Sequence, residues 1–239
     1  MTYCVAMALQ DGLVFAADSR TNAGVDQIAT YRKLHKFRVD DERLIVILSA
    51  GNLATTQSVV SLLQMRLNSD RKHLYGVSSM YDVATLVGST SREVLKRDAG
   101  LNQGTVDFGS SFIVGGQIRG EQPRLFLVYP EGNFIECTPD TPYFQIGENK
   151  YGKPILDRVV QYDLPLKQGA KCALISLDST IRSNLSVGLP LDVLIYERDS
   201  FGGGRHHDVT SDNDSFRSLG DAWSQGLREA FAKLPDMEW

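Results

Sequence analysis

The stretch YCVAMALQDGLVFAA, residues 3–17, is the clearest fold signal in the chain, because two apolar runs flank a turn. Residues 3–9 and 12–17 have the length and composition of buried strands, and Gln10-Asp11-Gly12 between them is a turn signal. We therefore predict an antiparallel hairpin at the N-terminus. A further apolar run at 44–50 ends at Gly51, and a four-stranded sheet before any helix is expected.

Helical periodicity begins at residue 53, with Thr55 or Thr56 as the expected N-cap. We predict a second helix at about 80–96, helical segments at 152–162 and 169–182, and a final amphipathic helix at 212–233. Strands are expected between them, at 111–116, 124–129, 133–137 and 192–197. The first helix has an apolar face, formed by Val59, Val60, Leu63 and Leu67.

The order of these elements indicates an α+β fold. Strands, two helices, strands, two helices, a strand and a last helix form a segregated pattern, which favours two antiparallel sheets with helices outside over a doubly wound parallel sheet. At 239 residues the chain is long enough for one sizeable core. We predict a single domain, 1–239, with a C-terminal helical extension from about residue 212.

Composition excludes several classes of function. A formal net charge of -4 leaves no basic surface for nucleic acid, and no apolar run approaches the roughly 20 residues of a membrane helix. No signal peptide is visible, so we expect a soluble, cytoplasmic protein that does not bind membranes. Cys4, Cys137 and Cys172 are widely separated, which predicts buried reduced thiols and neither a zinc site nor disulfides. No cofactor is expected.

Thr2 is a candidate nucleophile because it follows the initiator methionine. A small second residue permits removal of Met1, which leaves a free α-amine on a threonine. An α-amine has a pKa near 8 and can act as the base that activates its own hydroxyl. Most proteins with Thr at position 2 are not hydrolases, so the other residues of the chain carry the argument further.

Three later positions supply partners for such a nucleophile. Asp18 closes the second strand and is expected beside the start of the first. A lysine of the basic segment 31–37, which contains Lys33, would lower the pKa of the threonine hydroxyl. Lys36 is the rival lysine in that segment. Gly51 ends a strand just before a helix, where its amide would serve as an oxyanion donor. The alternatives are a solvated charge cluster and an ordinary strand-to-helix turn.

Taken in order, Thr2, the box Ala16-Ala17-Asp18-Ser19-Arg20, Thr21-Asn22-Ala23-Gly24, Lys33 and Ala50-Gly51 resemble a proteasome β-type subunit. The first seven residues and the extended C-terminal tail are most similar to the Anbu (ancestral β-subunit) branch. The resemblance spans nearly the whole chain. It implies the four-layer αββα sandwich of the N-terminal nucleophile hydrolases and peptide-bond hydrolysis through an acyl-enzyme. Ser49 and Leu53 are pocket-lining positions by the same resemblance.

Under this resemblance Thr2 is nucleophile and base, Asp18 pairs with Lys33, Lys33 tunes the threonine, and the Gly51 amide forms the oxyanion hole. The second half of the signature departs from the family. Its Gly-Ser-Gly-Ser turn is replaced by residues 145–150, where Glu148 would take over the hydrogen bonding of the missing serine. The later Arg-Asp-x-x-Ser-Gly-Gly segment keeps Ser186 but has Ser183 in place of the aspartate. Capping or packing is an equally good interpretation of Glu148 and Ser186.

The leading functional hypothesis is a self-compartmentalising threonine endopeptidase that acts on peptides or unfolded proteins. By resemblance it would form a homo-oligomer, either a ring or a helical turn. In that assembly the apolar face of the first helix would contact a neighbouring subunit. No docking motif for an ATPase is recognisable. The alternatives are a catalytically weak or silent scaffold subunit, and an amidohydrolase or amide transferase of the same superfamily.

Two segments near the C-terminus carry further signals. His206, His207 and Asp208 suggest a metal site, but the adjacent histidines follow three glycines, so a flexible loop at 202–207 is favoured. Residues 223–239 are expected to dock against the body or a neighbouring subunit, with Trp239 as an anchor.

Overall fold

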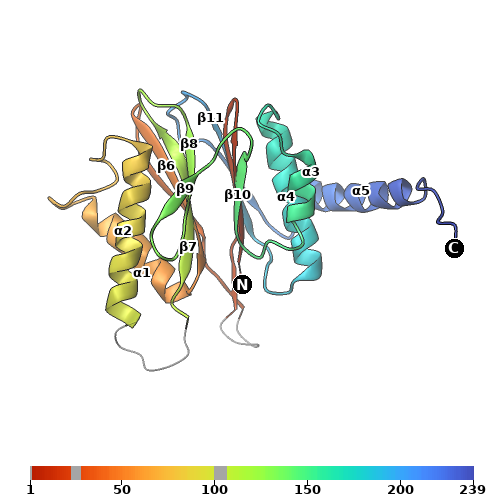
Figure 1. The fold of residues 1–239 in the computed structure, drawn as a ribbon, viewed down its shortest axis with the longest axis horizontal. Helices are drawn as coiled ribbons and strands as arrows, with labels where there is room; N and C mark the ends of the chain where they lie inside the picture. Colours follow the sequence, from red (N-terminus) through yellow and green to blue (C-terminus); the bar gives the residue numbers. More distant parts are fainter. Residues whose placement is uncertain (1, 23–27, 100–106) are drawn as a thin grey trace.

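The computed structural model describes residues 2–22, 28–99 and 107–239. In this part of the chain two five-stranded antiparallel sheets lie face to face, with α1 and α2 outside one sheet and α3 and α4 outside the other (Figure 1). The predicted α+β sandwich with four αββα layers is therefore confirmed.

The first sheet has the strand order β10-β1-β2-β11-β12. Its centre is the N-terminal hairpin, in which Cys4 pairs with Ala17 and Leu9 with Gly12, as predicted. The strands are β1 (Tyr3–Leu9), β2 (Gly12–Asp18), β10 (Tyr143–Gly147), β11 (Leu191–Glu197) and β12 (Arg205–Val209). Because β1 and β2 are central, both faces of the hairpin are buried.

The second sheet has the order β5-β6-β7-β8-β9. Its strands are β5 (Leu34–Val39), β6 (Arg43–Gly51), β7 (Ser110–Ile118), β8 (Arg124–Val128) and β9 (Phe134–Glu136), and a short separate pair is formed by β3 (Arg20–Asn22) and β4 (Ile28–Thr30). The expected four-stranded sheet before the first helix is wrong. The hairpins β1–β2 and β5–β6 belong to different sheets, since each covers one apolar face of the other.

Five helices occur in the described ranges: α1 (Leu53–Arg66), α2 (Met80–Ala99), α3 (Lys153–Val159), α4 (Leu166–Ser183) and α5 (Asp214–Phe231). Together the sheets and helices enclose three buried apolar layers. One lies between the sheets, one between the second sheet and α1 with α2, and one between the first sheet and α3 with α4. The start of α5 packs on α4 through Phe216, and the rest of the helix runs away from the body (Figure 1).

Two predictions about α1 need correction. Its N-cap is Asn52, whose side chain accepts a hydrogen bond from the Thr55 amide, so Thr55 and Thr56 already lie inside the helix. Val59, Val60 and Leu63 are buried within the chain, and the face expected to meet a neighbouring subunit packs on the second sheet instead, where Leu67 is partly buried. The periodicity identified an apolar face correctly but not what covers it.

Two further observations concern the cysteines and the apolar character of the helices. Cys4 and Cys172 are buried free thiols, as expected, whereas Cys137 is only partly buried. Among the described residues, no helix combines the length and the apolar character needed to cross a bilayer.

Candidate active site

The hairpin brings Asp18 beside the N-terminus. Asp18 is the last residue of β2, and its Oδ1 accepts a hydrogen bond of 2.9 Å from the backbone amide of Tyr3. Thr2, the preceding residue, is half-buried. The acid therefore lies one residue from the predicted nucleophile, as the antiparallel register of β1 and β2 requires.

Asp18 and Lys33 form a buried ion pair. Lys33 Nζ lies 2.6 Å from Asp18 Oδ1 and also donates to the carbonyl of Arg20 at 2.7 Å. The side chains are 0% and 4% exposed, so little solvent screens the pair. Burial raises the pKa of Asp18 above its usual range, and the adjacent Lys33 ammonium opposes that rise. The backbone amides of Tyr3 and Gly188 also favour the charged form of this carboxylate.

A cavity of about 520 Å³ opens at Thr2 and Lys33. Its lining includes five positions singled out from the sequence in addition to Thr2, namely Lys33, Ser49, Gly51, Leu53 and Glu148. Segments more than a hundred residues apart thus meet at one hollow. The lining also contains residues that were not predicted as site residues, which are Thr21, Tyr31, Ala50, Thr56 and Gly147.

Gly51 ends β6 at a position that excludes other residues. Its φ is +111°, and an added Cβ would lie 2.4 Å from the Gly109 carbonyl oxygen. Asn52 then caps α1, so the strand turns directly into the helix beside the cavity. The geometry places the Gly51 backbone at the cavity; its role as an oxyanion donor stays a prediction.

Gly147 and Glu148 close the cavity on the other side of Thr2. Gly147 has a φ of +85°, and a Cβ there would lie 2.0 Å from the Thr2 carbonyl oxygen. The Glu148 amide donates to the same oxygen at 2.6 Å. The Glu148 carboxylate accepts from the Lys150 amide at 3.1 Å and from Asn184 Nδ2 at 3.0 Å. Glu148 therefore lies at the cavity with both oxygens already engaged.

Ser186 and Lys36 are not among the residues that line the cavity. Ser186 is half-buried, and its amide donates to Asn184 Oδ1 at 2.9 Å, which links it to Glu148 through the Asn184 side chain. Lys36 is exposed and donates to the Gly203 carbonyl at 3.2 Å. Lys33 rather than Lys36 is thus the lysine beside Asp18.

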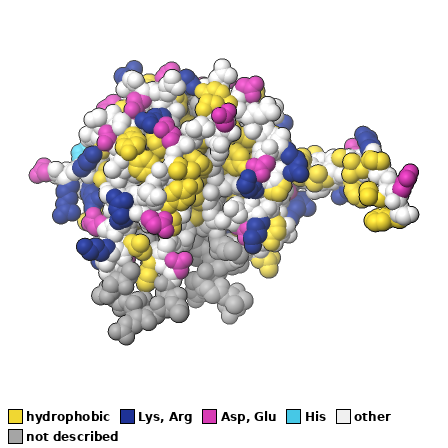
Figure 2. All heavy atoms as spheres, viewed as in Figure 1, with side chains coloured by type: hydrophobic (Ala, Val, Ile, Leu, Met, Phe, Trp, Pro, Cys, Tyr) yellow, Lys and Arg dark blue, Asp and Glu magenta, His cyan; other side chains and the backbone are white. Residues whose placement is uncertain are grey.

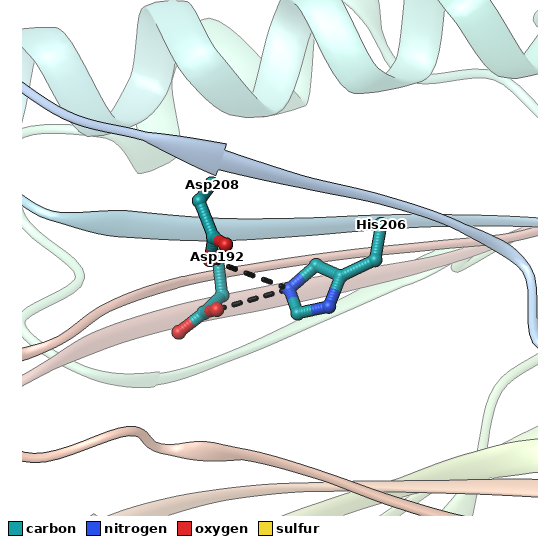
Figure 3. Close-up of side chains that lie close together, drawn as sticks. All are labelled: Asp192, His206 and Asp208. Atoms are coloured by element: carbon teal, nitrogen blue, oxygen red, sulfur yellow. Dashed lines mark hydrogen bonds and ion pairs between the residues drawn. The ribbon is translucent and has the colours of Figure 1, made fainter.

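The histidine segment forms a strand, not the predicted loop. Residues 205–209 are β12, which pairs with β11, and the alternation of strand side chains separates His206 from His207. Figure 3 shows His206 with Asp192 and Asp208; its Nε2 lies 2.9 Å from Asp192 Oδ1 and 3.9 Å from Asp208 Oδ1. Candidate ligand atoms of the three lie within 4.8 Å of one another.

Arg32 supplies a positive charge to this cluster. Arg32 binds both carboxylates, through Nη1 to Asp192 at 2.7 Å and through Nη2 to Asp208 at 3.0 Å. The cluster is therefore an ion-pair network in which arginine takes the place that a metal ion would need. Asp192 was missed because it appeared in the sequence only as the polar start of an apolar strand.

The comparisons with known proteins agree with this geometry. The family described as "Proteasome subunit" matches residues 2–195. Proteasome subunit beta 2 of Nitrosopumilus maritimus is 26% identical over 203 residues, which cover 84% of this chain and 88% of that protein.

Two solved structures are much more similar. Anbu (ancestral beta-subunit) from Yersinia bercovieri is 59% identical with a TM-score of 0.94, covering 100% of this chain and 99% of that one. A second structure, "Helical Assembly of the Anbu Complex from Pseudomonas aeruginosa", is 56% identical with a TM-score of 0.96, covering 99% and 98%. The chain therefore belongs to the proteasome subunit family and, within it, groups with the Anbu proteins.

Proposed function

We propose that this chain is a threonine peptidase of the N-terminal nucleophile type, with Thr2 as nucleophile once Met1 has been removed. The observation that carries the proposal is the buried Asp18–Lys33 pair, which lies beside Thr2 at a cavity. Perturbed, desolvated ion pairs in a cavity are typical of catalytic sites. The family supports hydrolase chemistry, and peptides or unfolded proteins are the substrates that we infer from it.

The proposed reaction needs only groups of this chain. The Thr2 α-amine accepts the proton of the Thr2 hydroxyl, whose oxygen attacks the peptide carbonyl. The Lys33 ammonium, held by Asp18, stabilises the negative charge that develops, and the Gly51 amide donates to the carbonyl oxygen. The amine then passes its proton to the leaving amine, which gives a Thr2 ester. Water, deprotonated by the same amine, hydrolyses the ester and restores Thr2.

Glu148 and Ser186 are assigned a supporting role. Both are connected through Asn184, and Glu148 also contacts the backbone of Thr2. We infer that this group holds the Thr2 end of β1 in place and takes over the function of the serine turn of proteasomal β subunits.

A catalytically weak or silent subunit is the second candidate, and one observation favours it. Both Glu148 oxygens are engaged, one by the Lys150 amide and the other by Asn184 Nδ2, so each already has a partner other than Thr2. If Glu148 does not replace the missing serine of the family's turn, the Thr2 amine is poorly oriented as a base. Hydrolysis of a small amide or an isopeptide remains a further alternative, which a product screen against peptides would distinguish.

We also propose that the chain forms a homo-oligomer, because its Pseudomonas aeruginosa relative is described as a helical assembly. The candidate contact surface is the outer part of α5. Its apolar stripe continues from Phe216, which is buried, to Leu227 and Phe231, which are exposed. The exposed Leu234 follows just after the helix. Figure 2 shows hydrophobic side chains gathered on the projecting arm. A second copy of this chain is the partner that we infer.

The decisive test of catalysis is an intact mass measured before and after treatment with a threonine-directed electrophile. We expect a mature chain without Met1 that gains one adduct. Thr2→Ala should abolish the adduct, whereas Thr2→Ser should retain part of the reactivity because a hydroxyl and a free amine both remain.

An uncleavable N-terminal tag provides the control for the amine. It converts the amine into an amide, which cannot act as a base near neutral pH, so the tagged protein should be as unreactive as Thr2→Ala. Full reactivity of a tagged protein of confirmed uncut mass would show that Thr2 is an ordinary strand residue.

A further inference from the structure

Asp192 on β11 accepts hydrogen bonds from two residues, one next to Asp18 and one next to Lys33. Asp18 and Lys33 form the buried ion pair of the site. Asp192 Oδ2 accepts from Ser19 Oγ at 2.9 Å, and its Oδ1 accepts from Arg32 Nη1 at 2.7 Å. Ser19 directly follows Asp18, and Arg32 directly precedes Lys33. A single carboxylate therefore connects the two chain segments that carry the catalytic pair.

The Asp192 carboxylate is buried, so its charge needs hydrogen-bond or ion-pair partners. Asp192 is 2% exposed and Ser19 is 1% exposed. The backbone around Ser19 is also engaged, since its amide donates to Pro190 at 2.9 Å and its carbonyl accepts from the Tyr31 amide at 2.7 Å. A buried carboxylate that lost these bonds would carry a large desolvation cost, so the network strongly favours one arrangement of the segments.

The strand β12 completes the network. His206 Nε2 lies 2.9 Å from Asp192 Oδ1, and Arg32 reaches from Asp192 to Asp208 (Figure 3). Asp208 is half-exposed, with 53% of its side chain accessible. It pairs with Arg32 at 3.0 Å and lies 3.9 Å from His206 Nε2. Asp192 is thus the buried centre of the network, and Asp208 is a peripheral member.

We propose that Asp192 is a positioning residue for the threonine site. Acting through Ser19 and Arg32, it holds segments 18–20 and 32–33 in the register at which Lys33 Nζ meets both Asp18 Oδ1 and the Arg20 carbonyl. The catalytic consequence rests on the proposed function. Displacement of a catalytic group by about 1 Å costs up to roughly a hundredfold in rate, so loosening these segments lowers Thr2 reactivity.

The position of Lys33 is measurable without any catalysis. Reductive methylation of the folded protein, read by peptide mass spectrometry, compares Lys33 with Lys36 three residues away. In the wild type we expect the exposed Lys36 to react and the buried Lys33 to be protected. In Asp192→Asn, modification of Lys33 should become at least about tenfold faster relative to Lys36, because the segment opens locally.

Three further variants separate positioning from packing. Asp208→Asn is the matched control and should leave Lys33 protected. Asp192→Glu keeps the charge and Asp192→Asn keeps the size, so protection that survives better in the glutamate variant identifies the charge as the operative feature. Ser19→Ala removes one link without changing charge. It should increase Lys33 modification even if Asp192→Asn does not fold.

The outcomes for this inference and for the proposed function are distinct. Unchanged Lys33 protection in folded Asp192→Asn and in Ser19→Ala would overturn the positioning role. A wild-type chain whose Thr2 never reacts with the electrophile would overturn the peptidase proposal and leave the Lys33 measurement valid. With both correct, Thr2 labelling falls by about ten- to a hundredfold in Asp192→Asn and stays near wild type in Asp208→Asn.

Discussion

Lys33 and Lys36 belong to one basic segment, yet only the first is buried against a carboxylate. Lys33 bonds Asp18 at 2.6 Å, whereas Lys36 is exposed and bonds the Gly203 carbonyl. Lys33→Ala is therefore expected to abolish labelling of Thr2, because no other described cation contacts Asp18. Lys36→Ala should label at the wild-type rate. The measurement is adduct formation by intact mass, and the reverse result would contradict the assignment.

We expect the free energy of unfolding of Lys33→Ala to depend on pH. Removing Lys33 leaves the buried Asp18 charge unpaired, which typically costs about 3–5 kcal/mol of folding free energy near neutral pH. Burial already raises the pKa of Asp18 in the folded state, so the folded chain binds this proton more tightly than the unfolded chain does. Stability of Lys33→Ala should thus recover as the pH falls through that raised pKa, as urea titrations at several pH values would detect. A loss independent of pH would exclude this explanation.

At the scale of elements, Gly147 at the end of β10 contacts the start of the N-terminal strand. Gly147 pairs with Tyr3 in the sheet, and a Cβ at this glycine would lie 2.0 Å from the Thr2 carbonyl oxygen. Gly147→Ala should therefore displace Thr2, cost about 1–3 kcal/mol through overpacking in addition to the positive-φ penalty, and reduce labelling. Urea unfolding and electrophile labelling measure the two effects.

Gly120 offers a matched control for that substitution. It has a φ of +94°, close to that of Gly147, but a Cβ there would meet nothing within 4 Å. Gly120→Ala should carry only the conformational penalty of about 1–2 kcal/mol and leave Thr2 labelling unchanged. Equal effects of the two substitutions would show that the close approach to Thr2 is unimportant.

On the scale of the whole molecule, the outer part of α5 is the surface that we expect to mediate assembly. Phe231 on this arm is 76% exposed, and Met65 on α1 is similarly exposed at 70%. Phe231→Asp should shift sedimentation toward the 26.5 kDa monomer, because it places a charge in the proposed contact. Met65→Asp tests a similarly exposed apolar residue on another surface and should leave assembly unchanged. A wild-type chain that stays monomeric at micromolar concentrations would contradict the proposed oligomer.

The sequence by itself determined the elements whose signals are local. The hairpin of β1 and β2 follows from two apolar runs and a turn, and its register alone places Asp18 next to Tyr3. The amphipathic helices were predicted because a period of 3.6 residues is visible in one window. β5 and β10 were missed, since each is short and has only two buried residues.

Only the tertiary structure determined what covers each apolar surface and which distant residues meet. Periodicity reports that the α1 face is buried but not that the second sheet covers it, and it does not divide two successive hairpins between two sheets. Asp192 and Ser19 are 173 positions apart, and the pairing of β12 with β11 converts a predicted loop into part of their network. The reason is physical: local sequence reflects the burial and backbone preferences of a segment, whereas its partners depend on how all layers pack together.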